Sequence, residues 1–242
     1  MNAVLEKIEA DTNTGTGLVP TPDESHQAPA VGEPFDALAV VDDPSSIIAE
    51  AVRALRTRIM AQHVQIGRRA LAVCGATPGV GCSFIAANLA VSLAQIGVRT
   101  ALVDADLRNP SLSRLLRVEH EGPGLSDFLA DPDIYIQDLV GEPLLPCLSF
   151  IPAGAIPGRP QELLASARFQ GLASHLLREH QVTIFDTTPA NGCTDAQRVA
   201  TVAGYSLVVA RKNSSYVDDL ATLAKLLRAD GSKVVGSVLV DL

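Results

Sequence analysis

Short apolar runs alternate with longer amphipathic segments from about residue 46 to the end of the chain. The runs predict buried strands, because strands covered on both faces are apolar throughout. They lie at residues 70–74, 101–103, 148–151, 182–185, 207–210 and 234–240. Helical spacing predicts helices at about 46–65, 83–96, 111–117, 160–179 and 215–229. Strands separated by helices indicate an α/β fold with one doubly wound, mostly parallel sheet.

The N-terminal stretch breaks this pattern and carries all of the net charge. The 242-residue chain has a formal net charge of −8, and residues 1–46 hold nine acidic residues against one basic residue. Proline-rich sequence with like charge predicts a disordered segment over 1–45, followed by one folded domain over 46–242. That domain has as many acidic as basic residues, which argues against a basic footprint for nucleic acid.

The remaining composition indicates a cytoplasmic protein. The sequence has no apolar run of the length needed to span a membrane, and no basic start followed by the apolar core of a secretory signal. The four cysteines, Cys74, Cys82, Cys147 and Cys193, are far apart, so we expect reduced thiols rather than a disulfide framework or a zinc site.

A glycine-rich turn, Gly75-Ala-Thr-Pro-Gly-Val-Gly-Cys-Ser83, follows the first predicted strand. Small residues let backbone N–H groups wrap a phosphate, and the next helix presents its positive end to the anion. The phosphate-loop positions are Ala76, Pro78, Gly79, Gly81, Cys82 and Ser83, with Cys82 in the position of the usual lysine. Two alternatives stay open: a dinucleotide-binding loop, whose third glycine would be Phe84, and a tight turn without a ligand.

Carboxylates follow two other predicted strands. Asp104 and Asp106 come after 101–103, and Asp186 follows 182–185. Parallel strands end at one edge of a sheet, so these carboxylates should lie near the turn. Carboxylate and hydroxyl oxygens suit Mg²⁺, so we expect Ser83, Asp104 and Asp186 to hold Mg²⁺ if a nucleotide binds. Asp104 and Asp106 are the catalytic candidates if the chain is active.

These motifs give the chain, from about residue 44 onward, a resemblance to the cytoplasmic bacterial tyrosine kinases, relatives of the division-site and plasmid-partition ATPases. Residues 101–111 are similar to the family's second Walker segment, and residues 182–189 to its Walker B strand. Connecting stretches at 124–127, 151–154 and 162–166 also match. The resemblance implies a P-loop NTPase fold, ATP or ADP with Mg²⁺ as cofactors, tyrosine kinase activity and a role in capsule or exopolysaccharide export.

The first predicted helix carries a charged strip that the family also has. Glu50, Arg53 and Arg56 fit the pattern Glu-x-x-Arg-x-x-Arg, which the resemblance implies to mediate subunit contacts in a ring. This spacing aligns the three groups along one helical strip, from which the guanidiniums could reach a neighbour's carboxylates. The general alternative is a solvated charged face.

Three departures from the family pattern bear on activity. Cys82 replaces the phosphate-loop lysine, and no lysine lies between residues 8 and 211. The family's C-terminal tyrosine cluster is not matched, since the last tyrosine is Tyr216. Val240 stands near the point where the family's last strand ends in asparagine. A cysteine at a helix N-terminus is expected to have a lowered pKa, and its thiolate would repel phosphate.

The leading interpretation is therefore a catalytically impaired, pseudokinase-like regulator or adaptor of exopolysaccharide biosynthesis and export, of capsule or holdfast type. Its expected partner is a membrane polysaccharide co-polymerase, which would recruit it to the inner membrane, or a kinase paralogue in a mixed oligomer. One alternative is an active ATP-dependent tyrosine kinase of the same pathway. Another is a partition-type ATPase, which salt-sensitive DNA binding would reveal. Redox sensing by Cys82 is a further hypothesis.

Overall fold

The computed structural model describes residues 38–140 and 145–241. Most of the acidic segment predicted for residues 1–45 therefore lies outside the described residues. Its last part forms the short helix α2 (Ala39–Asp42), in which Val40 is buried. The Val40 N–H donates to the side chain of Asn88 in the core at 3.2 Å. The folded part of the chain thus begins before residue 46.

Six parallel strands form one sheet in the order β3-β2-β4-β1-β5-β6. They are β1 (Ala70–Gly75), β2 (Thr100–Asp104), β3 (Leu148–Ile151), β4 (Val182–Asp186), β5 (Tyr205–Arg211) and β6 (Lys233–Val240). Strands β1, β2 and β4 are buried along their whole length, as their apolar sequences predict. The predicted α/β, doubly wound fold is confirmed, and the carboxyl ends of all six strands share one edge.

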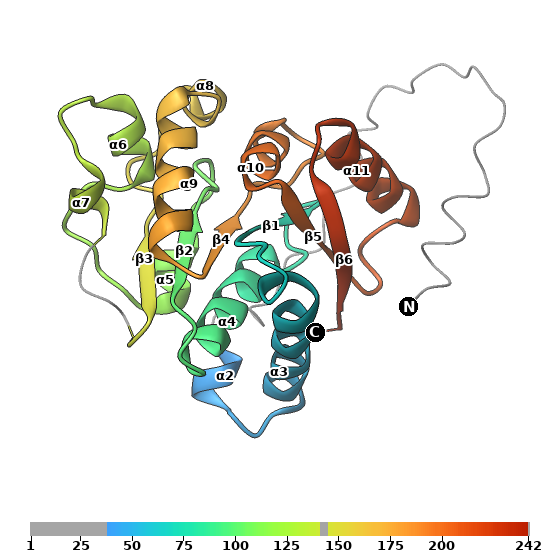
Figure 1. The fold of residues 1–242 in the computed structure, drawn as a ribbon. Helices are drawn as coiled ribbons and strands as arrows, with labels where there is room; N and C mark the ends of the chain where they lie inside the picture. The colour runs from blue at the N-terminus through green and yellow to red at the C-terminus, as the bar shows by residue number, and fades with distance from the viewer. Residues whose placement is uncertain (1–37, 141–144, 242) are drawn as a thin grey trace, which may run out of the picture. The chain divides into compact units, whose positions relative to one another are not determined.

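Helices cover both faces of the sheet (Figure 1). One face carries α2, α3 (Ile47–Ile59) and α4 (Cys82–Ala94), and the other carries α9 (Ala167–Glu179), α10 (Asp195–Ala203) and α11 (Val217–Ala229). Alternate residues of β1 divide between two apolar clusters: Leu71 packs on the α4 side, and Ala72 on the α10 side. None of the helices in the described ranges is long and apolar enough to cross a membrane.

Several helices differ from the sequence prediction. Besides the helices already named, the described residues form the π-helix η1 (Met60–Val64), α5 (Leu112–Leu116), α6 (Leu125–Ala130), α7 (Ile136–Leu139) and α8 (Pro160–Leu164). The helix predicted at 46–65 is α3 followed by η1. The helix predicted at 160–179 is two helices, because Ser166 caps the second by accepting the Phe169 N–H at 3.2 Å. The apolar pattern did not predict α6, α7 or α10, which are short.

Two glycines approach each other closely where the loop before α6 meets the segment after β3. A Cβ on Gly124 would lie 2.2 Å from the backbone nitrogen of Gly154 and 2.3 Å from its Cα. We expect Gly124→Ala to lower the free energy of unfolding by about 3 kcal/mol, because backbone atoms must shift.

The matched control is Gly171→Ala on α9, where an added Cβ meets nothing within 4 Å. Replacing this helical glycine should raise the free energy of unfolding by about 0.5–1 kcal/mol. Urea unfolding of the two variants measures both effects, and equal stability would contradict the close approach at Gly124.

Candidate phosphate-binding site

The glycine-rich turn joins the carboxyl end of β1 to the first turn of α4. Gly79 and Gly81 have φ angles of 73° and 98°, in the left-handed region that glycine adopts without strain. Gly81 is the N-cap of α4 and supplies no side-chain cap, so the first N–H groups of the helix face the turn. Phe84, at the third glycine position of the dinucleotide motif, is a buried core side chain. The turn has the backbone of an anion-binding loop, and Phe84 argues against the dinucleotide alternative.

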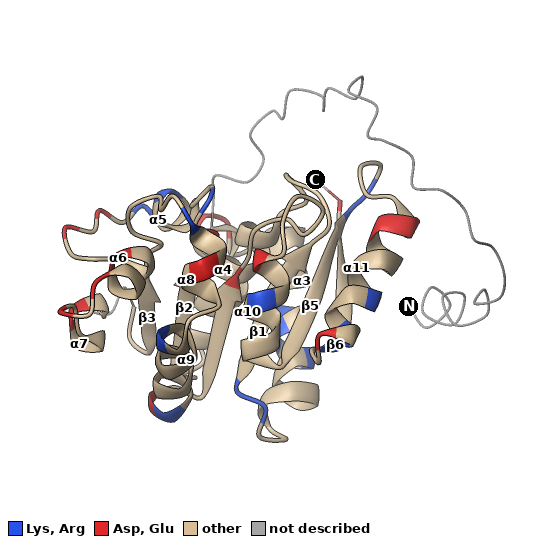
Figure 2. Cartoon of the chain, turned by 90° about the horizontal axis from the view of Figure 1, so that it is seen from above, with Lys and Arg blue, Asp and Glu red and all other residues tan. Residues whose placement is uncertain are grey.

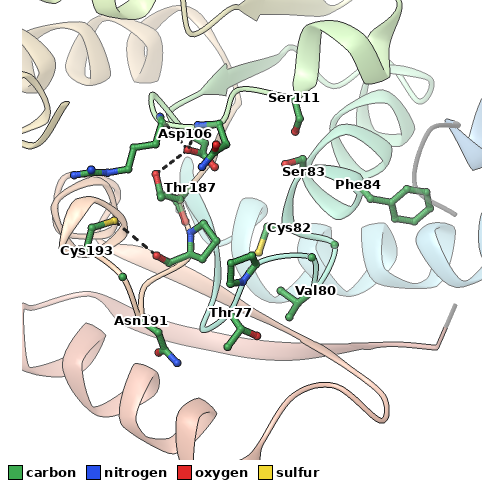
Figure 3. Close-up of a pocket in the computed structure, with 18 of the residues that line it drawn as sticks. Thr77, Val80, Cys82, Ser83, Phe84, Asp106, Ser111, Thr187, Asn191 and Cys193 are labelled. Atoms are coloured by element: carbon green, nitrogen blue, oxygen red, sulfur yellow. Dashed lines mark hydrogen bonds between the residues drawn. The ribbon is translucent and has the colours of Figure 1, made fainter. Parts of the chain in front are cut away.

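A cavity of about 820 Å³ opens beside the turn at the carboxyl edge of the sheet (Figure 3). Its wall is formed by the turn, by the segment that leads from β2 into α5, and by the segment that follows β4. The predicted site residues that line it are Pro78, Gly79, Gly81, Cys82, Ser83 and Asp106. Ala76, Asp104 and Asp186 do not line it and are buried at the strand ends. The structure therefore brings the three predicted strand ends together.

Asp104 and Asp186 end the neighbouring strands β2 and β4 and stand opposite each other in the strand register. Both are fully buried. Burial raises the pKa of Asp104 to about 7, although the hydrogen bond that its carboxylate accepts from the Leu112 N–H at 3.1 Å lowers the pKa in part. Burial, followed by the charge of Asp104, raises the pKa of Asp186 well above its usual value. Within the part of the chain that the structure describes, neither carboxylate oxygen of Asp186 has a hydrogen-bond partner.

Unpartnered buried carboxylate oxygens beside a second carboxylate suit a divalent cation. The Ser83 hydroxyl lies near Asp186 and opposes the rise in its pKa, without making a hydrogen bond of normal geometry. Ser83, Asp104 and Asp186 thus fit the predicted Mg²⁺ site. Among residues 38–140 and 145–241, no three His, Cys, Asp or Glu side chains form a metal site by themselves. Phosphate oxygens of a nucleotide would have to supply further ligands.

Asp106 is fixed at the cavity wall by three hydrogen bonds to its Oδ1. They come from the backbone N–H groups of Arg108 and Asn109, at 3.1 and 3.0 Å, and from Thr188 Oγ1 at 3.0 Å. The Arg108 side chain makes an ion pair with Asp195 of α10, with Nε 2.6 Å from Oδ2 and Nη2 3.3 Å from Oδ1. Sequence reasoning assigned no role to Arg108, Thr188 or Asp195, because nothing in the local sequence shows that these distant segments meet.

Cys82 lies in the cavity wall at the start of α4 (Figure 3). Its Sγ packs against the turn, since a Cβ on Gly75 would lie 2.8 Å from it. Burial, then the charge of Asp186 and the neighbouring Cys74, raise the pKa of the Cys82 thiol well above its usual value. The lowered pKa expected from the helix N-terminus is therefore wrong, because burial and carboxylates outweigh the helix dipole. A raised pKa disfavours the thiolate form that a redox sensor needs.

The charged strip on α3 is largely engaged within the chain. Arg53 Nη1 contacts Glu50 Oε2 at 3.1 Å, and its Nη2 donates to the Pro44 carbonyl at 2.6 Å. Arg56 Nη1 donates to the carbonyl and the Oγ of Ser92 on α4, at 3.2 and 3.1 Å. Arg56 thus fastens α3 to α4. Glu50 is exposed, with 75% of its side chain accessible, whereas Arg53 and Arg56 are both half-buried.

Proteins of similar sequence and structure are tyrosine kinases of bacteria. The chain is 31% identical over 202 residues to CapB of Staphylococcus aureus, which is named as a tyrosine-protein kinase, and the match covers 84% of this chain and 88% of CapB. The chain belongs to the bacterial tyrosine kinase family. The kinase domain of the Escherichia coli tyrosine kinase ETK matches it with a TM-score of 0.78 and 30% identity, covering 88% of this chain and 82% of that domain. The resemblance read from the motifs is confirmed.

Other bacterial tyrosine kinases of similar sequence are much longer. EpsB of Ralstonia nicotianae is 35% identical over 207 residues, which are 86% of this chain and 27% of EpsB. The chain thus spans about a quarter of the length of these relatives. A profile of the ParA family, described as NUBPL iron-transfer P-loop NTPase, matches residues 67–134. The Pyrococcus horikoshii septum site-determining protein MinD, solved with Mg-ADP, matches with a TM-score of 0.62, 22% identity and 71% of this chain covered. The fold is that of the P-loop NTPases.

Proposed function

We propose that this member of the bacterial tyrosine kinase family is a cytoplasmic regulator or adaptor of exopolysaccharide biosynthesis that binds ATP or ADP with Mg²⁺ and transfers phosphate poorly. One observation carries the proposal. The turn between β1 and α4 has the backbone of an anion-binding loop and lies beside the strand ends that carry Asp104 and Asp186, whereas Cys82 stands where the family's loop has lysine.

Nucleotide binding and phosphate transfer depend to different degrees on the residue at position 82. Transfer requires neutralisation of the charge on the β- and γ-phosphates as the bond breaks. Removing one preorganised donor from such a site costs about 3–4 kcal/mol, or about 10²–10³ in rate, and a full cation should count for at least as much. The N–H groups of the turn can still hold phosphate in the ground state. Nucleotide binding should therefore survive where transfer fails.

The proposed partner is a membrane polysaccharide co-polymerase, which would recruit the chain to the inner membrane. A kinase paralogue in a mixed oligomer is the other partner that the family suggests. The pathway is supported by a relative in Klebsiella pneumoniae, 26% identical over 202 residues, whose name assigns a tyrosine-protein kinase to the cps region. Once bound to such a partner, the chain would regulate it through the contact itself and not through phosphate transfer.

The α3 strip of Glu50, Arg53 and Arg56 is the proposed oligomer contact, with Arg53 the arginine that is not bonded to α4. We expect Arg53→Glu to reduce oligomer size or partner capture, because reversing this charge repels a neighbour's carboxylates. Sedimentation velocity checks the size. Arg56→Glu serves as the comparison, since it removes the contact with Ser92 and should lower the melting temperature. Unchanged sedimentation and unchanged partner capture for Arg53→Glu would contradict the interface.

Calorimetry and a labelled-phosphate assay on the purified chain test the proposed function. We expect measurable Mg²⁺-dependent ATP binding together with little transfer of the γ-phosphate to tyrosine. Robust transfer that is lost in Asp104→Ala would instead support an active kinase.

A further inference from the structure

The glycine-rich turn is held by an arginine from a strand that the phosphate-loop motif does not include. Arg211 ends β5, and its Nη1 donates to the Gly79 carbonyl at 3.2 Å, although the two residues are 132 positions apart. Gly79 lines the cavity and Arg211 does not, so the guanidinium contacts the turn and not the space beside it. The structure thus places a cation against the turn by a direct hydrogen bond.

The backbone that carries the Arg211 side chain is itself fixed. Its N–H donates to Ser215 Oγ at 2.9 Å, and its carbonyl accepts the N–H groups of Ser214 and Ser215 at 3.3 and 2.9 Å. On the other side, Arg211 lies in the sheet opposite Val240 of β6. Figure 2 shows basic residues (blue) where β5 leads into the turn before α11. The guanidinium therefore reaches the glycine-rich turn from a well-defined point of the fold.

The carbonyl that Arg211 binds belongs to a peptide unit next to a glycine. Gly79 has a φ angle of 73° and no side chain, so the peptide that follows it can rotate at little steric cost. That peptide is planar, so a bond that fixes the Gly79 carbonyl also fixes the direction of the Val80 N–H. Backbone N–H groups are what such a turn offers to phosphate. The bond from Arg211 therefore sets the orientation of one donor of the turn.

From this contact we infer that Arg211 is a positioning residue of the phosphate loop, which holds the peptide between Gly79 and Val80 in the orientation that binds an anion. The inference rests on the proposed nucleotide site and adds what keeps its loop in place. The guanidinium stays charged at all physiological pH values, so the contact does not depend on pH. Because Arg211 bonds to the loop, it acts through the Val80 N–H and does not replace the lysine that is absent at Cys82.

Hydrogen exchange of the nucleotide-free chain tests the contact itself, and calorimetry with Mg-ADP tests its consequence. Arg211→Met removes the charge and the donors but keeps an unbranched side chain. We expect faster exchange of the N–H groups of residues 80–83 and about two- to thirtyfold weaker binding of Mg-ADP, the range for a residue that acts through another. Arg211→Lys should restore most of both, because an ammonium can also donate to the Gly79 carbonyl.

Arg69→Met is the matched control, because it removes the same kind of bond at the other edge of the sheet. Arg69 Nη1 donates to the Leu177 carbonyl, also at 3.2 Å, and Arg69 comes directly before β1, whereas the glycine-rich turn follows β1. Both substitutions should affect the melting temperature alike. Exchange of the turn and affinity for Mg-ADP should change only in Arg211→Met.

Unchanged exchange of the turn or wild-type ADP affinity in Arg211→Met would overturn the inference and leave the proposed function intact. An equal loss of affinity in Arg69→Met would do the same, since the effect would then not depend on the contact with Gly79. A wild-type chain that binds no nucleotide would overturn the proposed function, and hydrogen exchange of the turn would then decide the inference by itself.

Discussion

Cys82→Lys is expected to raise the rate of phosphate transfer from ATP by about 10²–10³ over the wild type. The substitution returns a cation to the first residue of α4, where the backbone of the turn and the carboxylates of Asp104 and Asp186 are already arranged. Removal of one preorganised donor costs about that factor in comparable sites. A lysine here would also be attracted by the buried carboxylates that now raise the pKa of the thiol.

Cys82→Met is the control for this gain, because methionine also lengthens the side chain but carries no charge. Labelled ATP and the appearance of phosphotyrosine or free phosphate measure the rate, with thermal melts to show that both variants fold. An equal rate for wild type, Cys82→Met and Cys82→Lys would mean that residue 82 does not limit transfer.

Asp186→Asn is expected to stabilise the nucleotide-free chain at pH 8 and to have much less effect at pH 4. Burial raises the pKa values of Asp104 and Asp186, so the folded state binds protons more tightly than the unfolded state. The stability linked to these protons is present below the unfolded pKa of about 4 and is lost as pH rises through the folded values. For Asp104, a rise from 3.8 to about 7 corresponds to about 4 kcal/mol. Asparagine removes one charge from the pair.

The same variant should lose Mg²⁺-dependent ATP affinity, because it removes a carboxylate from the predicted metal site. Urea unfolding at the two pH values and calorimetry with Mg-ATP give the two readouts. Asp106→Ala is the contrast, since it deletes three hydrogen bonds and should lower stability at both pH values. A pH-independent effect of Asp186→Asn would contradict the buried charged pair.

Patterns local to the sequence predicted most of the fold and the outline of the site. Apolar runs predicted all six strands. The ends of β1, β2 and β4 were recognisable because glycine or aspartate directly follows the apolar run in each case. The helix break at Ser166 was not predicted, because the apolar spacing continues through this cap.

Properties that depend on contacts between distant segments could not be predicted. The Arg108–Asp195 ion pair joins residues 87 positions apart. Arg56 contacts Ser92, 36 positions away, and the helical strip alone does not show that this guanidinium links two helices of the same chain. The helix N-terminus, which is visible in the sequence, predicts a lowered pKa for Cys82, whereas its proximity to Asp186 and Cys74, which raises the pKa, is a property of the fold.

A single-turnover experiment tests most directly whether this site binds nucleotide without efficient transfer. Wild-type chain in excess over labelled ATP and Mg²⁺, at a concentration above the measured dissociation constant, is quenched over time and compared with Cys82→Lys. We predict that the bound label remains ATP in the wild type over a period in which Cys82→Lys converts it. Conversion by the wild type at the rate of Cys82→Lys would contradict it.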